Sequence, residues 1–327
     1  MAVSPTRRLF LCGAAVFPFV AASTFAWADF PLRPIRIVVS FPPGGGIDIL
    51  ARLMAPKMSE RLGQTVIVEN RAGANGLIAT QSVSQADADG YTILCGTLGT
   101  LSVNQSLYAG RPGTDMEKDF MPLSHIASLP LTLTVHNSVP VKSVKELIEY
   151  AKARPGQVLF GSSGIGGLPH LCGELFNAQA GIKTVHVPYR GSSPCFTDLA
   201  SGRVQFVFDA YAIALPFIQN GNIRLLATTE PTKLKALADV PPMKDTLPDF
   251  NVTNWYGMVV RKGTPPAVVS RLNEEVIHAL RLPDVAERAD ALGIEVVGTT
   301  PEQFGAFQHK EIARWAEVIR NAKINVE

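Results

Sequence analysis

Two glycine-rich segments carry the residues best suited to recognise a ligand. Residues 41–48 read Phe-Pro-Pro-Gly-Gly-Gly-Ile-Asp, and residues 160–170 read Phe-Gly-Ser-Ser-Gly-Ile-Gly-Gly-Leu-Pro-His. Each follows a β-rich run and precedes a helical pattern. Glycines permit tight turns and leave N–H groups uncovered at the helix start, where the helix dipole favours an anion. A third, weaker segment is residues 188–194, where we expect Ser193 as N-cap and Pro194 as the first helical residue.

Neither main segment matches a known phosphate-binding motif. The glycines are not followed by Gly-Lys-Ser/Thr, and neither segment spells Gly-x-Gly-x-x-Gly. A single glycine-rich turn is often only a tight connection between a strand and a helix. Two such turns, one in each predicted α/β unit, favour a binding role. By exclusion, the sequence predicts a carboxylate rather than a nucleotide as the bound anion.

An enzymatic interpretation finds little support in the same segments. Residues 161–165 approach the nucleophile elbow Gly-x-Ser-x-Gly, but Ile165 occupies its last position. Ser163, His170 and Asp209 occur in an order unlike that of the α/β-hydrolases, and their spacing does not bring them together. We interpret His170 as a first-turn helix residue that hydrogen-bonds locally rather than as a base. We therefore expect no catalytic residue.

Three charged residues near the predicted loops leave alternatives open. Asp48 is either a carboxylate that complements the start of its helix or a ligand contact, and we keep it among the candidate site residues. Asp209 ends a very apolar run, residues 204–208, so its carboxylate should have a partner. Arg190 is a candidate partner for Asp209 or for the ligand, and the sequence does not choose between them.

The cysteines indicate neither a metal site nor a disulfide framework. Beyond the first 28 residues the chain has Cys95, Cys172 and Cys195, none of them in a Cys-x-x-Cys motif. No His or Cys pair has metal-ligand spacing. We expect three buried thiols, with a bridge between Cys172 and Cys195 as the alternative. Neither a metal nor an organic cofactor is predicted.

The first 28 residues have the pattern of an export signal. Arg7 and Arg8 precede an apolar run, residues 9–20, and Ala-Trp-Ala at 26–28 resembles a cleavage site. A membrane anchor is the alternative, but the run is shorter than the ~20 residues of a span. The segment fits both the ordinary secretory and the twin-arginine route. We expect a signal peptide over residues 1–28 and a protein exported to the periplasm.

The remaining chain is neutral and long enough to bury a large core. Of its 30 basic residues, two lie in the signal, so 28 basic residues face 28 acidic ones, which argues against nucleic acid and membrane surfaces as partners. With 46% hydrophobic residues among 327, disorder is excluded as well.

Alternating β-rich and helical patterns predict two α/β units rather than one large sheet. The expected strands are residues 34–41, 65–69, 91–95, 157–160, 184–187, 204–208 and 223–227. Pro56 should kink or shorten the first helix. The tail is predicted to be helical, with Pro265-Pro266 opening its first helix, and Thr-Pro-Glu-Gln at 300–303 should cap a last helix that docks through an apolar face.

Five segments, in order, resemble the Bug family of periplasmic receptors for tripartite tricarboxylate transporters. They are residues 34–46, 68–71, 161–170, 186–191 and 254–257. The resemblance implies an α/β type II periplasmic-binding-protein fold, with two α/β domains, a hinge and an interdomain ligand cleft. It places residues 29–126 plus 253–327 in domain 1 and residues 127–252 in domain 2.

The resemblance also implies a ligand site made mainly of backbone N–H groups and ordered water. Phe41, Gly44, Gly45 and Gly46 would form the first jaw. Thr97 and Thr100 look like hydroxyl contributors. The second jaw and the adjoining wall would comprise Ser163, Gly164, Ile165, Gly166, Gly167, His170, Tyr189, Arg190 and Asp209.

Two departures from the family pattern bear on the ligand. Ile47 stands where many relatives have Thr or Ser, and Leu101 where many have His. A less polar pocket suits an aromatic acid or a dicarboxylate such as terephthalate better than citrate. The resemblance implies capture without chemistry and delivery to membrane permease subunits, or presentation to a membrane histidine kinase. We expect a monomer that binds a small carboxylate and no nucleic acid.

Overall fold

The structure is a computed structural model that describes residues 1–2, 30–232, 234–250, 252–321 and 323–324. By its internal contacts the chain separates into Met1–Phe30 and Pro31–Glu327, and all elements below belong to the second unit. The predicted signal peptide, residues 1–28, lies outside the described residues apart from residues 1–2. Within the part that is described, no helix is long and apolar enough to cross a membrane.

The first elements form the parallel βαβ arrangement that the sequence predicts. β1 (Ile35–Val39) lies between β2 (Val66–Asn70) and β3 (Thr92–Thr97) and is parallel to both. Helix α1 (Gly46–Leu62) connects β1 to β2. Of the two effects expected at Pro56, the shortening is wrong, because α1 continues past this residue to Leu62 and ends at Gly63, whose φ of 66° closes the helix; a kink stays a prediction.

A second parallel set follows the same logic. β5 (Leu159–Ser162) pairs with β6 (Val185–Pro188) and with β7 (Phe206–Ala210), both in parallel. Helices α6 (Leu168–Ala180) and α7 (Ser192–Ala200) make the connections.

The predicted start of α7 is wrong by two residues. Gly191, with a φ of 107°, is the N-cap, the helix begins at Ser192, and Pro194 is its third residue. Ser193 therefore does not cap the helix, and the hydroxyl of the first helical residue, Ser192, donates to Asp209.

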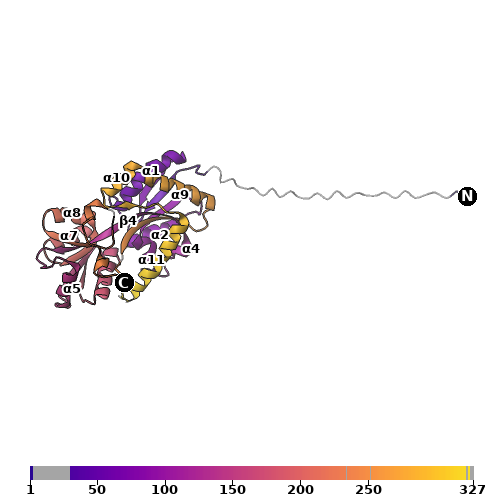
Figure 1. Ribbon diagram of the computed structural model, residues 1–327. Helices are drawn as coiled ribbons and strands as arrows, with labels where there is room; N and C mark the ends of the chain where they lie inside the picture. Colours follow the sequence, from indigo (N-terminus) through magenta and orange to yellow (C-terminus); the bar gives the residue numbers. More distant parts are fainter. Residues whose placement is uncertain (3–29, 233, 251, 322, 325–327) are drawn as a thin grey trace. The chain divides into compact units, whose positions relative to one another are not determined.

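One long strand joins the two sets. β4 (Phe120–His136) is antiparallel to β9 (Thr253–Arg261) through its first part and to β7 and β8 (Ile223–Thr228) through its last part. The described strands therefore form one hydrogen-bonded path, β2-β1-β3-β9-β4-β7-β5-β6, with β8 and β10 paired to β4. The expectation of two units without a shared sheet is wrong on this point. Figure 1 shows β4 between α1, α9 and α10 on one side and α5, α7 and α8 on the other.

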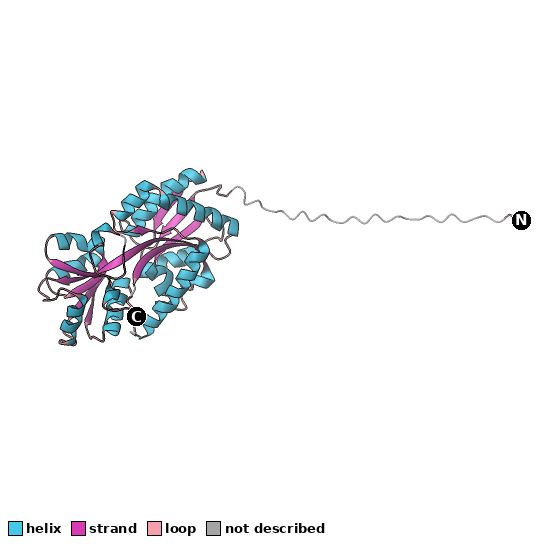
Figure 2. Cartoon of the chain, viewed as in Figure 1, coloured by secondary structure: helices cyan, strands magenta, loops and turns pink. Residues whose placement is uncertain are grey.

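Helices flank the strands, as Figure 2 shows. The other elements are η2 (Ala74–Gly76), α2 (Leu77–Ser84), η3 (Gly99–Val103), α3 (Asn104–Leu107), α4 (Met116–Asp119), α5 (Val144–Lys152), α8 (Tyr211–Gln219), η4 (Lys235–Leu237), η5 (Met243–Asp245), α9 (Pro266–Arg281), α10 (Pro283–Asp290) and β10 (Glu295–Val296).

The last helix, α11 (Pro301–Asn321), has the predicted cap. The Thr300 N–H donates to Gln303 Oε1 at 3.1 Å, and the Gln303 N–H donates to Thr300 Oγ1 at 3.3 Å. Its apolar face docks on the unit through buried Phe304 and Trp315. Both the Trp315 and the Trp255 indole N–H groups donate to Glu311 Oε2, at 3.0 and 3.2 Å. These bonds fasten α11 to β9.

The thiols are buried and unbridged. Cys95, Cys172 and Cys195 are free and have no exposed surface. This confirms their interpretation as core residues, and the alternative bridge between Cys172 and Cys195 does not form.

Candidate functional site

A cavity of about 460 Å³ lies at the carboxyl ends of strands from both parallel sets. Its walls come from the segments that follow β1, β2, β3, β5 and β6, from the ends of β3 and β7 with the start of α8 (Tyr211–Gln219), and from the strands β4 and β9. The lining residues are Phe41, Gly45, Gly46, Ile47, Asn75, Thr97, Gly99, Leu131, Ser163, Gly164, Ile165, Gly167, Leu168, Pro169, Gly191, Ser192, Asp209, Ala210, Ile213, Asn254 and Tyr256.

First turns of α1, α6, α7 and α8 contribute to this lining. Their N-caps, Gly45, Gly167, Gly191 and Ala210, all line the cavity. The first N–H groups of a helix have no partner within the helix, and the dipole places partial positive charge there. The main chain therefore places partial positive charge around the cavity. The sequence predicted helix starts at three of these places, with that of α7 two residues too late. It missed α8 because β7 runs into this helix without a glycine-rich loop.

Some loop N–H groups already have partners, and others do not. The Gly44 N–H donates to Asp48 Oδ2 at 2.9 Å, and the Gly166 N–H donates to His170 Nδ1 at 3.1 Å. In the described part of the chain, the N–H groups of Gly46 and Leu168 donate to no acceptor. These two amides, one from α1 and one from α6, belong to residues that line the cavity, and they are candidate donors to a bound anion.

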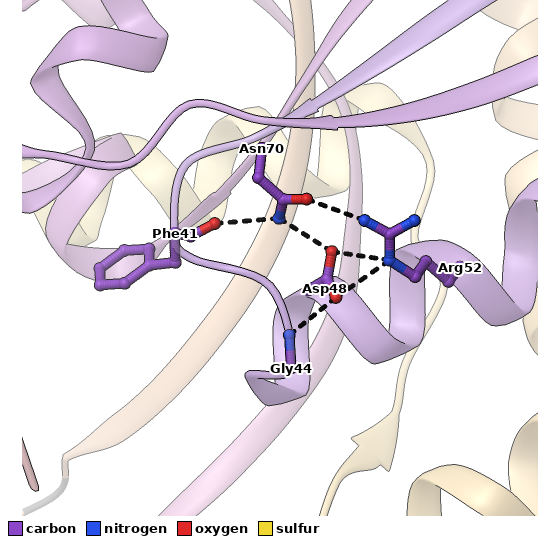
Figure 3. Close-up of polar contacts among 5 residues, drawn as sticks. All are labelled: Phe41, Gly44, Asp48, Arg52 and Asn70. Atoms are coloured by element: carbon purple, nitrogen blue, oxygen red, sulfur yellow. Dashed lines mark hydrogen bonds and ion pairs between the residues drawn. The ribbon is translucent and has the colours of Figure 1, made fainter.

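Asp48 holds the first loop through hydrogen bonds to its neighbours (Figure 3). Besides Gly44, its carboxylate accepts from Arg52 Nε at 3.0 Å and from Asn70 Nδ2 at 2.8 Å. Asn70 Nδ2 also donates to the Phe41 carbonyl at 3.0 Å. Burial works to raise the pKa of Asp48, but the bonds from Arg52, Gly44 and Asn70 hold it below its ordinary value. Asp48 is thus ionised and fully engaged, and it is not part of the lining.

The two candidate threonines, Thr97 at the end of β3 and Thr100 in η3, have different positions. Thr97 lines the cavity. Thr100 is fully buried, and its hydroxyl lies 3.1 Å from Ser40 Oγ and 3.2 Å from the Asn75 carbonyl. Thr100 therefore supports the segment that brings Asn75 to the cavity.

The second loop divides in the same way. Ser163, Gly164, Ile165 and Gly167 line the cavity, whereas Gly166 is buried outside the lining. Ile165 is 52% exposed and forms part of the rim.

His170 lies behind this loop and outside the lining. It accepts from Gly166, which confirms the predicted local hydrogen bond, and it stacks on His186 with 3.8 Å between ring centroids. His186 Nε2 lies 2.6 Å from Ser162 Oγ. Burial lowers the pKa of each ring to about 4, so both are neutral at pH 7.

Of the three remaining candidates, Asp209 lines the cavity, whereas Tyr189 and Arg190 do not. The Tyr189 hydroxyl donates to Asp198 Oδ2 at 2.8 Å, outside the lining. Arg190 is exposed and makes no ion pair with any described residue. Asp209 is 5% exposed and lines the cavity. Its partners are the Ser192 hydroxyl at 2.6 Å and the Ala210 N–H at 2.8 Å, and not Arg190. Burial raises the pKa of Asp209 to about 6.

Several lining residues were missed by the sequence analysis. Asn254 and Tyr256 come from β9, and Leu131 from β4. A Cβ atom at Gly46 would lie 3.0 Å from the Tyr256 hydroxyl, so this phenol stands beside the start of α1. Asn254 and Tyr256 lie in the segment 254–257, whose family resemblance was the sequence feature that could have identified them.

The charge of the lining is unusual for an anion site. Among its residues there is no Lys, Arg or His, and Asp209 is the only ionisable acid. Within the lining itself, partial positive charge comes from the helix starts.

This fold and this cavity are those of an α/β solute-binding receptor of the periplasmic-binding type. The model of the tripartite tricarboxylate transporter family receptor (TctC) matches residues 50–324, and the chain belongs to this family. The predicted Bug-type resemblance and α/β fold class are confirmed.

Three relatives illustrate the likeness. Protein BugT of Bordetella pertussis is 36% identical over 317 residues, covering 96% of this chain and 97% of that protein. The structure of Rpa4515 of R. palustris with adipate is 36% identical, with a TM-score of 0.79, and covers 91% of this chain and 99% of that one. The structure of MatC from Rhodopseudomonas palustris with bound malate is 29% identical, with a TM-score of 0.75, and covers 89% and 100%.

Proposed function

We propose that this protein captures a small carboxylate in the cavity, without chemistry, for uptake by a tripartite tricarboxylate transporter. The observation that carries the proposal is the convergence of the starts of α1, α6, α7 and α8 on a lining without a basic side chain. Such an arrangement stabilises an anion through main-chain donors. Two family members with similar folds hold adipate and malate.

The ligand we propose is an aromatic acid or a dicarboxylate, terephthalate being one example. Apolar side chains cover much of the cavity, including Phe41, Leu131 and Ile213. Ile47, which stands where many relatives have a hydroxyl residue, lines it as well. An apolar wall between two sets of amide donors suits a flat or extended carbon skeleton with a carboxylate at one or both ends.

We propose that the unit comprises two domains that close on the ligand, residues 29–126 plus 253–327 and residues 127–252. The support is the division of β4, which pairs with β9 up to Pro130 and with β7 from Leu131 onward. β4 and β9 would then be the crossing strands of the hinge. Closure would bring the starts of α1 and α6 onto the same anion, and a higher affinity for the closed state would shift the population toward it.

The same proposal includes an exported monomer. A signal peptide over residues 1–28 would direct the chain to the periplasm, and permease subunits in the membrane would receive the ligand. A membrane histidine kinase is the alternative partner that the family resemblance allows. No feature of the described residues favours it, so it stays outside the proposal.

A thermal-shift screen tests the function. Purified protein is heated with mono-, di- and tricarboxylates, among them adipate, malate, benzoate and terephthalate. Ligand at about a hundred times its dissociation constant should add ~2.7 kcal/mol of stability. The carboxylate that binds should be recovered unchanged by chromatography. Chemical conversion of the bound acid, or stabilisation by no carboxylate, would contradict the proposal.

A further inference from the structure

Asp209 is an acid in a cavity that we propose for acids, and this inference rests on that proposed function. The side chain is buried and lies between two other lining residues, Ser192 and Ala210. An ionised Asp209 would repel a carboxylate held by the nearby helix starts, because no basic side chain of the lining offsets its charge. Its protonation state therefore matters for binding.

The groups around Asp209 do not supply a compensating charge. Cys172 of α6, Cys195 of α7 and Tyr256 of β9 interact with it electrostatically, and burial raises the pKa of all three, so they are neutral at pH 7. α8 carries Tyr211 as its only titratable side chain. The segments of β4 and β5 that pair with β7 contain no titratable residue. Removal from water thus acts on Asp209 without an opposing cation.

The Ser192 hydroxyl can respond to the state of Asp209. Its oxygen lies 2.6 Å from Asp209 Oδ2, a distance that suits donation in either direction. While Asp209 is ionised, the Ser192 hydrogen is committed to it and Ser192 offers a ligand only lone pairs. Once Asp209 is protonated, its O–H can donate to Ser192, and the Ser192 hydrogen can turn toward a ligand oxygen.

We infer that Asp209 takes up one proton from solvent when a carboxylate binds, and that Asp209 and Ser192 together donate a hydrogen bond to the ligand. The pair is then a specificity-determining element that favours fully ionised acids. Such a ligand gains a donor and loses a repelling charge in the same step. An ionised Asp209 would instead favour ligands that bring their own donor, such as a hydroxyl group.

The proton uptake makes binding dependent on pH. With an Asp209 pKa of about 6 in the free protein, a ligand that binds only the protonated form loses affinity as pH rises. Between pH 6.5 and 8.5 the dissociation constant should rise about 75-fold, and uptake at pH 7.5 should approach about one proton per ligand. Dicarboxylates such as adipate are fully ionised in this range and contribute no proton of their own.

Isothermal titration calorimetry with adipate, succinate and malate tests the inference. Titrations at pH 7.5 in buffers of different ionisation enthalpy count the protons taken up, and titrations from pH 6.5 to 8.5 give the slope. The wild-type protein alone suffices for both measurements. Asp209→Asn should remove the uptake and flatten the slope. Ser192→Ala should weaken binding but keep the uptake. The control variant Asp198→Asn removes a carboxylate of α7 that lies outside the lining, and it should behave as wild type.

The outcomes separate this inference from the proposed function. Binding with no proton uptake and a flat pH profile overturns the inference and leaves the function intact. Malate bound much more tightly than succinate at pH 8.5, again without uptake, also overturns it and assigns Asp209 to reading the ligand hydroxyl. Failure of every carboxylate to bind at any pH overturns the proposed function, and the inference with it.

Discussion

Replacing Asp48 by Asn should destabilise the first loop without creating a cavity in the core. Asp48 is 2% exposed and accepts from Gly44, Arg52 and Asn70, which fixes the course of the chain from Phe41 to the start of α1 (Figure 3). An Asn side chain has one carbonyl oxygen in place of two carboxylate oxygens, so at least one of these donors loses its acceptor. Arg52 and Gly44 can reach water, which limits the loss.

We expect Asp48→Asn to lower the free energy of unfolding by about 1–3 kcal/mol at pH 7. For a unit of this size, that corresponds to roughly 2–5 °C in the melting temperature. The matched control is Glu69→Gln, because Glu69 also bonds an arginine, Arg71 at 2.6 Å, but its side chain is 34% exposed. An exposed pair of this kind contributes about 0–1 kcal/mol.

The pH dependence gives a sharper test of the same substitution. The pKa of Asp48 is lower in the folded protein than in the unfolded chain, so its charge stabilises the fold above about pH 4 and this contribution is lost as pH falls through the folded value. Denaturant unfolding at several pH values should therefore show wild type and Asp48→Asn converging toward acid pH. Equal stability at pH 7, or a gap that stays constant down to the acid transition, would refute the role given to Asp48.

Three further predictions concern the cavity and its supports. Gly173→Ala should destabilise the protein by about 1–3 kcal/mol in denaturant unfolding despite the better helix propensity of Ala, because the new Cβ would lie 2.1 Å from the Phe160 ring; unchanged stability would contradict the packing. Gly46→Ala should weaken carboxylate binding about tenfold by calorimetry, since its methyl group would meet the Tyr256 hydroxyl at 3.0 Å. Gly45→Ala, whose new Cβ would have no atom nearer than 3.9 Å, should reduce the affinity much less. A larger loss of affinity in Gly45→Ala than in Gly46→Ala would count against the donor at Gly46. The pKa of both His170 and His186 is about 4 in the folded protein and ordinary in the unfolded chain, so the free energy of unfolding should fall as pH drops from about 6.5 to 4, by at most ~1.4 kcal/mol per pH unit for each ring. His186→Gln should reduce this slope. A wild-type pH profile in the variant would exclude His186 as a source of the pH dependence.

Local chemistry explains why so much of the loop architecture could be predicted. The capping pair of Thr300 and Gln303, the glycine-rich turn before Gly46 and the turn before Leu168 all depend on residues within a few positions of one another. Their structure is therefore written in short stretches of sequence.

The long strand β4 could not be predicted in the same way. Its sequence contains Pro122 and Pro130, and a proline within an expected strand argues against that assignment. In the structure a register shift against β9 lies next to Pro122, and Pro130 is the last residue paired with β9 before β4 turns to β7. Both prolines are accommodated at irregular points of the ladder, which only the partner strands define.

The sequence also could not predict which individual side chains line the cavity. Thr97 ends β3 and Thr100 lies three residues later in η3, yet only Thr97 lines the cavity. The sequence offered Arg190 as a candidate partner for Asp209, but the Asp209 carboxylate accepts a hydrogen bond from the short Ser192 side chain instead. Which face of a loop meets the cavity depends on packing between elements far apart in the sequence, and local rules contain no information on it.

The separation of roles in this cavity has a consequence for ligand choice. In the proposed function, main-chain donors such as Gly46 and Leu168 would hold the anion whatever side chains surround them, so substitutions in the wall would change the ligand without removing the capacity to hold a carboxylate. Ile47 and Ile165 contribute carbon surface to that wall, and Asp209 contributes the one charge that changes with pH. Exchange of Ile47 for Thr should therefore alter the ranking of carboxylates in the thermal screen rather than abolish binding. Loss of all binding on that exchange would mean that the wall, and not the helix starts, holds the ligand.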